Sequence, residues 1–141
     1  MDSYQQTLIA VADDCPVRAS VQPTERGGKP TVAVLQYEML SAHPRQHTME
    51  DVLFQSWLAR QESAAPHAST EIAQLRAEFF AKPQACLRAS PLPKKYGFGL
   101  LFDEEGRIEL CPMESAEYRQ IVAGKAKGIR VLKAMRSAKA K

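Results

Sequence analysis

The stretch Phe98–Leu110 reads FGLLFDEEGRIEL and predicts a β-hairpin. Apolar residues alternate from Phe98 to Phe102 and again from Ile108 to Leu110, as they do in strands with one buried face. The intervening residues DEEG supply a short loop, in which Gly106 can adopt a left-handed conformation. The second half of the chain therefore contains at least two antiparallel strands.

The flanking segments predict one earlier strand and several helices. Thr7–Ala12 is short, apolar and followed by two aspartates, which predicts a buried strand. Helical spacing and capping residues predict helices over 32–40 after Thr31, over 49–58 after Thr48, from Ser69 or Thr70 onward, and over 116–123. This order of elements predicts an α+β fold with a mainly antiparallel sheet and helices packed on one face.

Five quoted stretches resemble an uncharacterised bacterial family, a domain of unknown function. They read VADDCP, GGKPTVAVLQYEML, DVLF, CLRASPLPKKYGFGLLFDEEGRIEL and ESAEY, and they follow one another within residues 7–118. The resemblance implies that this part of the chain is one evolved unit. It implies no activity, and it assigns no active-site residue.

Composition places the chain among folded cytoplasmic proteins. No segment reaches the roughly 20 apolar residues that a membrane span requires, and the N-terminus lacks the pattern of a secretory signal. The three cysteines are widely spaced, and an odd number cannot all pair within one chain. A reducing cytoplasm is therefore the expected location, with no membrane partner.

Charge divides the chain into two parts. Residues 1–118 hold eleven cations and all sixteen acids, a net charge of −5, whereas residues 119–141 carry +8. We expect residues 1–124 to form a single α+β domain and residues 125–141 to form a basic C-terminal tail. The tail is expected either as a solvated extension or as a basic amphipathic helix after Gly128. Tail-mediated binding of nucleic acid is an alternative function, disfavoured because no aromatic residues alternate with the cations.

The stretch from Cys86 to Gly99 gives the best candidate binding site. Three cations flank a turn of Pro91, Leu92 and Pro93, beside a hydroxyl and a phenol, and such a group can hold a phosphate or a carboxylate. The ordinary interpretation is a strand over 86–90, a proline turn and two solvated lysines. The predicted ligand-binding set from this stretch is Arg88, Ser90, Lys94, Lys95 and Tyr96.

A second candidate group follows the first strand. Asp13, Asp14 and Cys15 stand where a strand ends, a position at which paired carboxylates can bind a ligand or act as acid and base. Aspartates before a proline are also ordinary turn residues. A hydrolytic or thiol-dependent enzyme using these three residues is therefore the alternative function, and whether the protein is an enzyme stays open.

No metal or cofactor is expected from the sequence. His43 and His47 have the spacing of a helical zinc pair, but Pro44 disfavours a helix there, so the pair predicts a loop between helices. The function predicted first is thus a binding domain for a small anionic ligand or for a protein partner, including a second copy of the chain.

Overall fold

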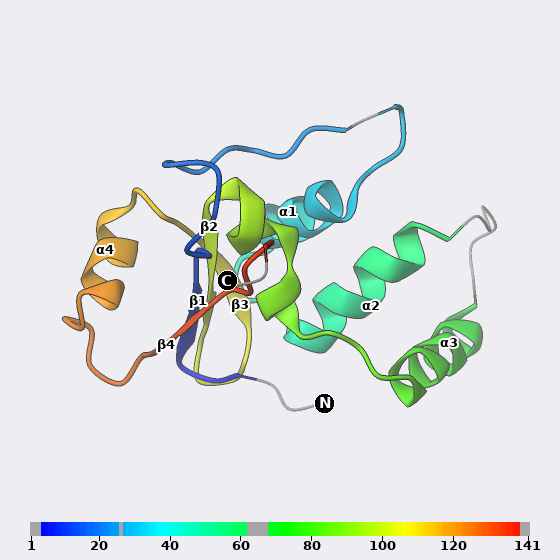
Figure 1. Ribbon diagram of the computed structural model, residues 1–141. Coiled ribbons are helices and arrows are strands. Elements are labelled where there is room, and N and C mark those ends of the chain that lie inside the picture. Colours follow the sequence, from blue (N-terminus) through cyan, green and yellow to red (C-terminus); the bar gives the residue numbers. More distant parts are fainter. Residues whose placement is uncertain (1–3, 26, 62–67, 139–141) are drawn as a thin grey trace.

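The computed structural model describes residues 4–25, 27–61 and 68–138, which form an α+β fold around one four-stranded sheet (Figure 1). The elements in chain order are β1 (Thr7–Ala10), α1 (Val32–Ala42), α2 (Met49–Ala59), α3 (Ser69–Ala81), the 3-10 turn η1 (Leu87–Ala89), the π-helical turn η2 (Leu92–Tyr96), β2 (Phe98–Phe102), β3 (Ile108–Pro112), α4 (Ala116–Val122) and β4 (Arg130–Lys133). The predicted fold class is confirmed.

The sheet has the strand order β3-β2-β1-β4 and is mostly antiparallel. β2 pairs antiparallel with β3 and with β1, whereas β1 and β4 run parallel. The predicted hairpin is confirmed as β2 and β3. In its turn one Asp103 carboxylate oxygen accepts hydrogen bonds from the amides of Glu105 and Arg107, at 2.8 and 2.9 Å, and Gly106 has a φ of 79°.

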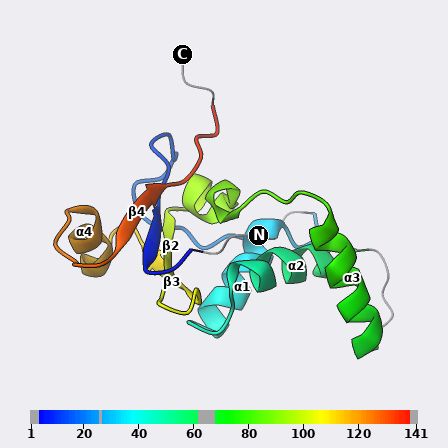
Figure 2. The same ribbon diagram turned by 90° about the horizontal axis from the view of Figure 1, so that it is seen from below.

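Side chains alternate between the two faces of the sheet, and helices cover both faces (Figure 2). Ile9 and Leu100 belong to a core cluster with residues of α1, α2, η1 and η2. Leu8 and Leu101 belong to a second cluster with Tyr118 and Ile121 of α4. The expectation that helices pack on one face fits α1 and α2, but α4 lies on the opposite face.

Two of the three predicted helix caps are confirmed. Thr31 accepts a hydrogen bond from the Val34 amide, and Thr48 forms a reciprocal capping box with Asp51. The third predicted cap, Ser69 or Thr70 at the start of α3, is wrong. The N-cap of α3 is Ala68, and no side chain caps this helix. A capping residue type near a helix start is insufficient when the backbone places it inside the first turn.

α3 stands apart from the sheet and packs on α2 (Figure 1). None of its residues is buried, and its main contacts are aromatic, with the Phe79 ring 5.2 Å from Trp57 and 5.8 Å from Phe54. Within the described ranges, no helix has the length and apolarity needed to cross a lipid bilayer.

The strand predicted over residues 86–90 is wrong. The chain forms η1 there, with hydrogen bonds from Ala89 N to Cys86 O and from Ser90 N to Leu87 O, and η2 follows. The amides of Ala89 and Ser90 are used by these local hydrogen bonds, so this segment forms a 3-10 turn in place of a strand ladder.

The helix expected after Gly128 is also wrong, because residues 130–133 form the edge strand β4. Arg130 N donates to Gln6 O and Ala134 N donates to Ala10 O, both at 2.9 Å. Ala134 is buried in the core cluster of the first face. Ile129 and Leu132 are half-buried, so their spacing serves a strand and its flanking turn.

Candidate functional site

The predicted aspartate pair holds the chain's own C-terminal segment. Asp13 forms an ion pair with Lys133, the last residue of β4. The Asp14 carboxylate accepts hydrogen bonds from the backbone amides of Ser137 and Ala138, at 2.9 and 3.0 Å. The amide of Ala138 is the largest factor that lowers the pKa of Asp14. These carboxylates therefore act as a clamp on residues 133–138.

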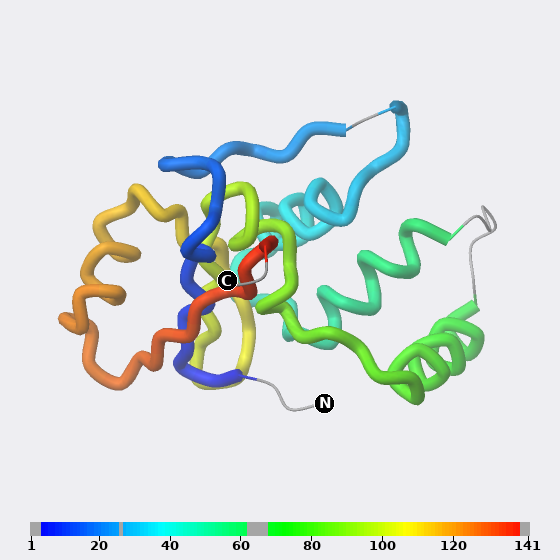
Figure 3. Tube along the Cα trace, in the orientation of Figure 1, coloured from blue at the N-terminus to red at the C-terminus, as the bar shows by residue number. Residues whose placement is uncertain are grey.

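Arg88 contacts the same segment from the other side. Its Nε donates to the carbonyl of Lys133, and its own carbonyl accepts from the amide of Met135, both at 2.8 Å. Because the parallel register turns residues 130, 132 and 134 toward β1, the groups that Arg88 meets lie on the outer edge of the sheet. Of the two predicted groups, Arg88, Asp13 and Asp14 thus contact residues 133–138. The C-terminal segment passes beside the stretch that contains η1 (Figure 3).

Ser90 and Tyr96 are built into the fold. The Ser90 hydroxyl is buried, donates to the Gln36 side chain at 2.6 Å and accepts from the Leu92 amide at 3.2 Å. The Tyr96 ring packs against the core cluster of the first face, and its carbonyl accepts from Val21 N. Ser90 therefore fixes η2 against α1.

The remaining predicted residues lie separately. Lys94 is half-buried and Lys95 is exposed, and no hydrogen bond or ion pair joins either side chain to another described residue. Cys15 is half-buried and packs against the core cluster of the second face. Cys15 therefore lies on another face of the fold from Cys86, which packs against the first cluster.

A group that sequence reasoning missed gathers around Tyr4. The Tyr4 hydroxyl lies 3.5 Å from the Cys86 thiol, and the guanidinium carbon of Arg130 lies 5.8 Å from the Tyr4 ring centroid. The ring itself packs edge-on against Phe102, with centroids 5.5 Å apart. We call Tyr4, Cys86, Arg88 and Arg130 the Tyr4 cluster. Its members come from three distant segments, which only the pairing of β1 with β4 brings together.

The Tyr4 cluster is electropositive. The hydrogen bond with Cys86 and burial raise the pKa of Tyr4, while the positive charges of Arg88 and Arg130 act in the opposite direction. Among the residues that the structure describes, no carboxylate forms an ion pair with Arg88 or Arg130. The Tyr4 cluster thus holds two guanidinium groups that have no carboxylate partner among the described residues.

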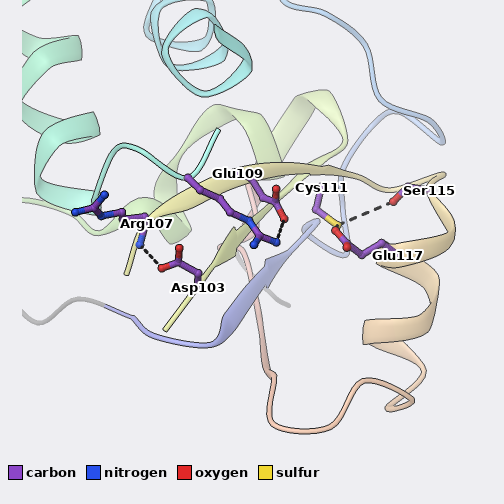
Figure 4. A network of polar contacts seen from close by, with 7 residues as sticks. Asp103, Arg107, Glu109, Cys111, Ser115 and Glu117 are labelled. Atoms are coloured by element: carbon purple, nitrogen blue, oxygen red, sulfur yellow. Dashed lines mark hydrogen bonds and ion pairs between the residues drawn. The ribbon is translucent and has the colours of Figure 1, made fainter. Parts of the chain in front are cut away.

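Cys111, His43 and His47 form no cluster like that around Tyr4 among the described residues. Cys111 is buried beside Ser115 and donates toward a Glu117 oxygen at 3.9 Å, and burial raises its pKa to about 11 (Figure 4). The rings of His43 and His47 lie 5.7 Å apart in the loop between α1 and α2, as predicted. No group of three or more metal-ligating side chains gathers within the described ranges.

Comparison with protein families matches residues 1–140 to a family described as a family of unknown function, DUF6157. The match includes the basic C-terminal segment and so extends beyond the resemblance at residues 7–118. No curated protein and no solved structure matches the chain.

Proposed function

The chain belongs to the DUF6157 family of unknown function, and we propose that it binds a small anionic ligand at the Tyr4 cluster. The ligand carries a phosphate or a carboxylate group. Arg88 and Arg130 supply the positive charge, and the Tyr4 hydroxyl supplies a further hydrogen-bond donor.

One geometric observation carries this proposal: the Arg130 guanidinium lies over the Tyr4 ring, 5.8 Å from its centroid, and neither Arg130 nor Arg88 has a carboxylate partner among the described residues. Surface arginines in an acidic chain segment commonly have carboxylates available, and Arg45, Arg76 and Arg107 do pair with them. A bound anion would neutralise the charge that the fold leaves at the Tyr4 cluster.

The geometry of the donors suits an oxyanion. The Nε of Arg88 donates to the Lys133 carbonyl, and its terminal nitrogens make no hydrogen bond to another residue that the structure describes, so they can donate in parallel to a ligand. The Arg130 side chain makes no hydrogen bond to another described residue and is exposed. A planar guanidinium of this kind binds two oxygens of a phosphate or carboxylate at once.

Thermal unfolding with added inorganic phosphate, and separately with acetate, tests the proposal at constant ionic strength set by chloride. A ligand held by the folded state raises the Tm, and at a hundredfold excess over Kd it adds about 2.7 kcal/mol to the free energy of unfolding. Arg130→Gln and Tyr4→Phe should each weaken binding roughly tenfold, the loss of one hydrogen bond to a charged group.

Two control variants separate this site from nonspecific charge effects. Arg60→Gln removes an exposed arginine at the end of α2, and Lys95→Gln removes a cation of the sequence-predicted set. Both should keep the wild-type Kd. A wild-type Tm that does not respond to either anion, or equal losses in Arg60→Gln and Arg130→Gln, would contradict the proposal.

We further propose a cytoplasmic location and a bacterial origin. Cys15, Cys86 and Cys111 are all free thiols, which suits a reducing compartment. Labelling of the three thiols in freshly lysed cells tests the location, because persistent disulfides would contradict it.

A second candidate function is self-association through α3. Its Leu75 lines two hollows at the surface, and the larger of them, about 460 Å³, is shared with Trp57 and Phe79. Glu78 and Lys82 line this larger hollow and lie one helical turn apart. Two copies of α3 related by a two-fold axis can therefore place each Glu78 against the other copy's Lys82. Such an interface would bury the apolar side chains that the monomer leaves half-exposed.

Light scattering during size-exclusion chromatography tests the self-association. Lys82→Glu should yield a monomer, and the double variant Glu78→Lys with Lys82→Glu should restore the dimer, because the charge pair is then reversed. A wild-type protein that stays monomeric at the highest soluble concentration would contradict this function.

A further inference from the structure

A hollow of about 210 Å³ opens where β2 ends and where β1 and β4 begin. This is the lower end of the sheet in Figure 1. A hollow of this volume has room for a small ligand. The apolar part of its lining consists of Leu101, Phe102 and Ile129.

Backbone strain is concentrated at this hollow. Gln6 and Arg45 are the non-glycine residues with positive φ in the described ranges, at 44° and 59°, and both line it. Each is held by the sheet, since Gln6 N donates to Asp103 O at 3.0 Å and Arg45 N donates to Ile108 O at 2.9 Å. Strained residues that the surrounding structure fixes are common at binding sites, because they aim a side chain that a relaxed backbone would direct elsewhere.

The polar lining carries both signs of charge. Arg45 and Lys127 are the cations, and Asp103 and Glu104 are the anions. One nitrogen of Arg45 donates to Glu109 at 2.9 Å, so its other nitrogens can donate to a ligand. One oxygen of Asp103 accepts from the turn amides, so its other oxygen can accept from a ligand.

Three polar side chains of the lining can hydrogen-bond to a ligand. The side chains of Gln6, Glu104 and Lys127 make no hydrogen bond or ion pair with another residue that the structure describes. The Gln6 carboxamide oxygen also lies beside Gly128, 3.7 Å from where a Cβ would stand. The hollow therefore offers donors and acceptors around an apolar floor.

We propose that this hollow binds a free α-amino acid. Its carboxylate faces Arg45 and Lys127, and its ammonium faces Asp103 and Glu104. Its side chain lies on the floor formed by Leu101, Phe102 and Ile129. Because the lining presents both signs of charge, a zwitterion can pair with its cations and its anions at once, whereas a ligand with one charge pairs with one sign only. This site shares no residue with the Tyr4 cluster and does not depend on it.

Binding is measured by calorimetry and by backbone amide shifts, with leucine as the probe. N-acetyl-leucine lacks the ammonium and leucine amide lacks the carboxylate, so each should bind roughly tenfold more weakly than leucine. The shifts should concentrate at residues 101–104 and 127–129. Absence of leucine binding at millimolar concentration, or equal affinity for leucine and both analogues, would overturn the proposal.

Variants assign the two ends of the ligand. Lys127→Gln should weaken leucine binding roughly tenfold but leave the affinity for leucine amide unchanged, and Glu104→Gln should do the same with N-acetyl-leucine. Arg45→Gly relieves the left-handed strain, so it should raise Tm while it lowers affinity. Arg60→Gln, an exposed arginine outside both proposed sites, serves as the matched control and should bind leucine normally. If Lys127→Gln and Glu104→Gln retain wild-type affinity for leucine, the assignment is wrong.

Discussion

The hydroxyl oxygen of Tyr118 accepts a hydrogen bond of 2.9 Å from the backbone amide of Val11. Val11 directly follows β1, so the phenol of α4 satisfies the first amide beyond that strand. Both residues are buried in the core cluster of the second face, together with Ile121. α4 is therefore attached to the sheet by a polar bond as well as by apolar packing.

Tyr118→Phe should lower the free energy of unfolding by about 1–3 kcal/mol, because the buried Val11 amide loses its partner. Urea unfolding measures the change. Tyr37→Phe is the matched control, since the Tyr37 ring packs on Phe98 but its hydroxyl bonds to no other described residue. The control should change stability by less than about 0.5 kcal/mol. Equal losses in both variants would show that the Val11 bond contributes nothing.

Cys111 predicts a loss of stability at alkaline pH. Burial raises the pKa of its thiol from the ordinary 9.0 to about 11 in the folded protein. The neutral thiol thus stabilises the fold fully below about pH 9, and this contribution is lost as pH rises toward 11. The total is on the order of 3 kcal/mol for a pKa difference of about 2. Cys111→Ala should flatten the pH dependence of urea unfolding between these values, and an unchanged slope would refute the assignment.

The Asp14 clamp predicts faster amide exchange after a single substitution. Asp14→Asn removes the negative charge that binds the amides of Ser137 and Ala138, so both should exchange hydrogen for deuterium faster. The Met135 amide, which donates to Arg88, should keep its protection. Asp13→Asn, which affects only the pair with Lys133, should leave Ser137 and Ala138 protected.

Acid should release the same clamp. The pKa of Asp14 is lowered below its ordinary 3.8, chiefly by the Ala138 amide, so the clamp is complete above that value. It is lost as pH falls through the lower folded-state pKa. Exchange at Ser137 and Ala138, corrected for the intrinsic pH effect, should therefore increase below about pH 3.8 in the wild type and stay constant in Asp14→Asn. A pH-independent protection in the wild type would contradict this.

The capping box of α2 should contribute more than the residues at the start of α3. Thr48→Ala should cost about 1 kcal/mol, because the Asp51 amide loses its acceptor. Ser69→Ala should be almost neutral, since no side chain caps α3. Thermal unfolding of the two variants provides the comparison, and a larger effect at Ser69 would restore the cap expected from the sequence.

Local patterns predicted the local elements. The alternation from Phe98 to Leu110 and the capping residues Thr31 and Thr48 gave the hairpin and two helix starts, because turn chemistry and capping act within a few residues. β4 was missed for the opposite reason. The apolar residues in and around β4 have helical spacing in the sequence. They form a strand because they pair with β1, which lies over 120 residues earlier in the chain.

The candidate sites could be predicted only in part. Asp13, Asp14 and Arg88 were singled out from charge and position, and they do share one neighbourhood, but the C-terminal segment lies between them. Tyr4 and Arg130 gave no signal in the sequence. Neither residue lies in a motif, and their proximity to Cys86 follows from the parallel pairing at the sheet edge.

That parallel pairing of the first strand with the last also sets a time order for biosynthesis. The edge of β1 that faces β4 has no partner until residue 133 has left the ribosome. Until then the nascent chain presents a bare apolar strand to chaperones and to other nascent chains. A delay before residue 133 emerges should therefore increase aggregation of the newborn chain more than an equally long delay after it has emerged.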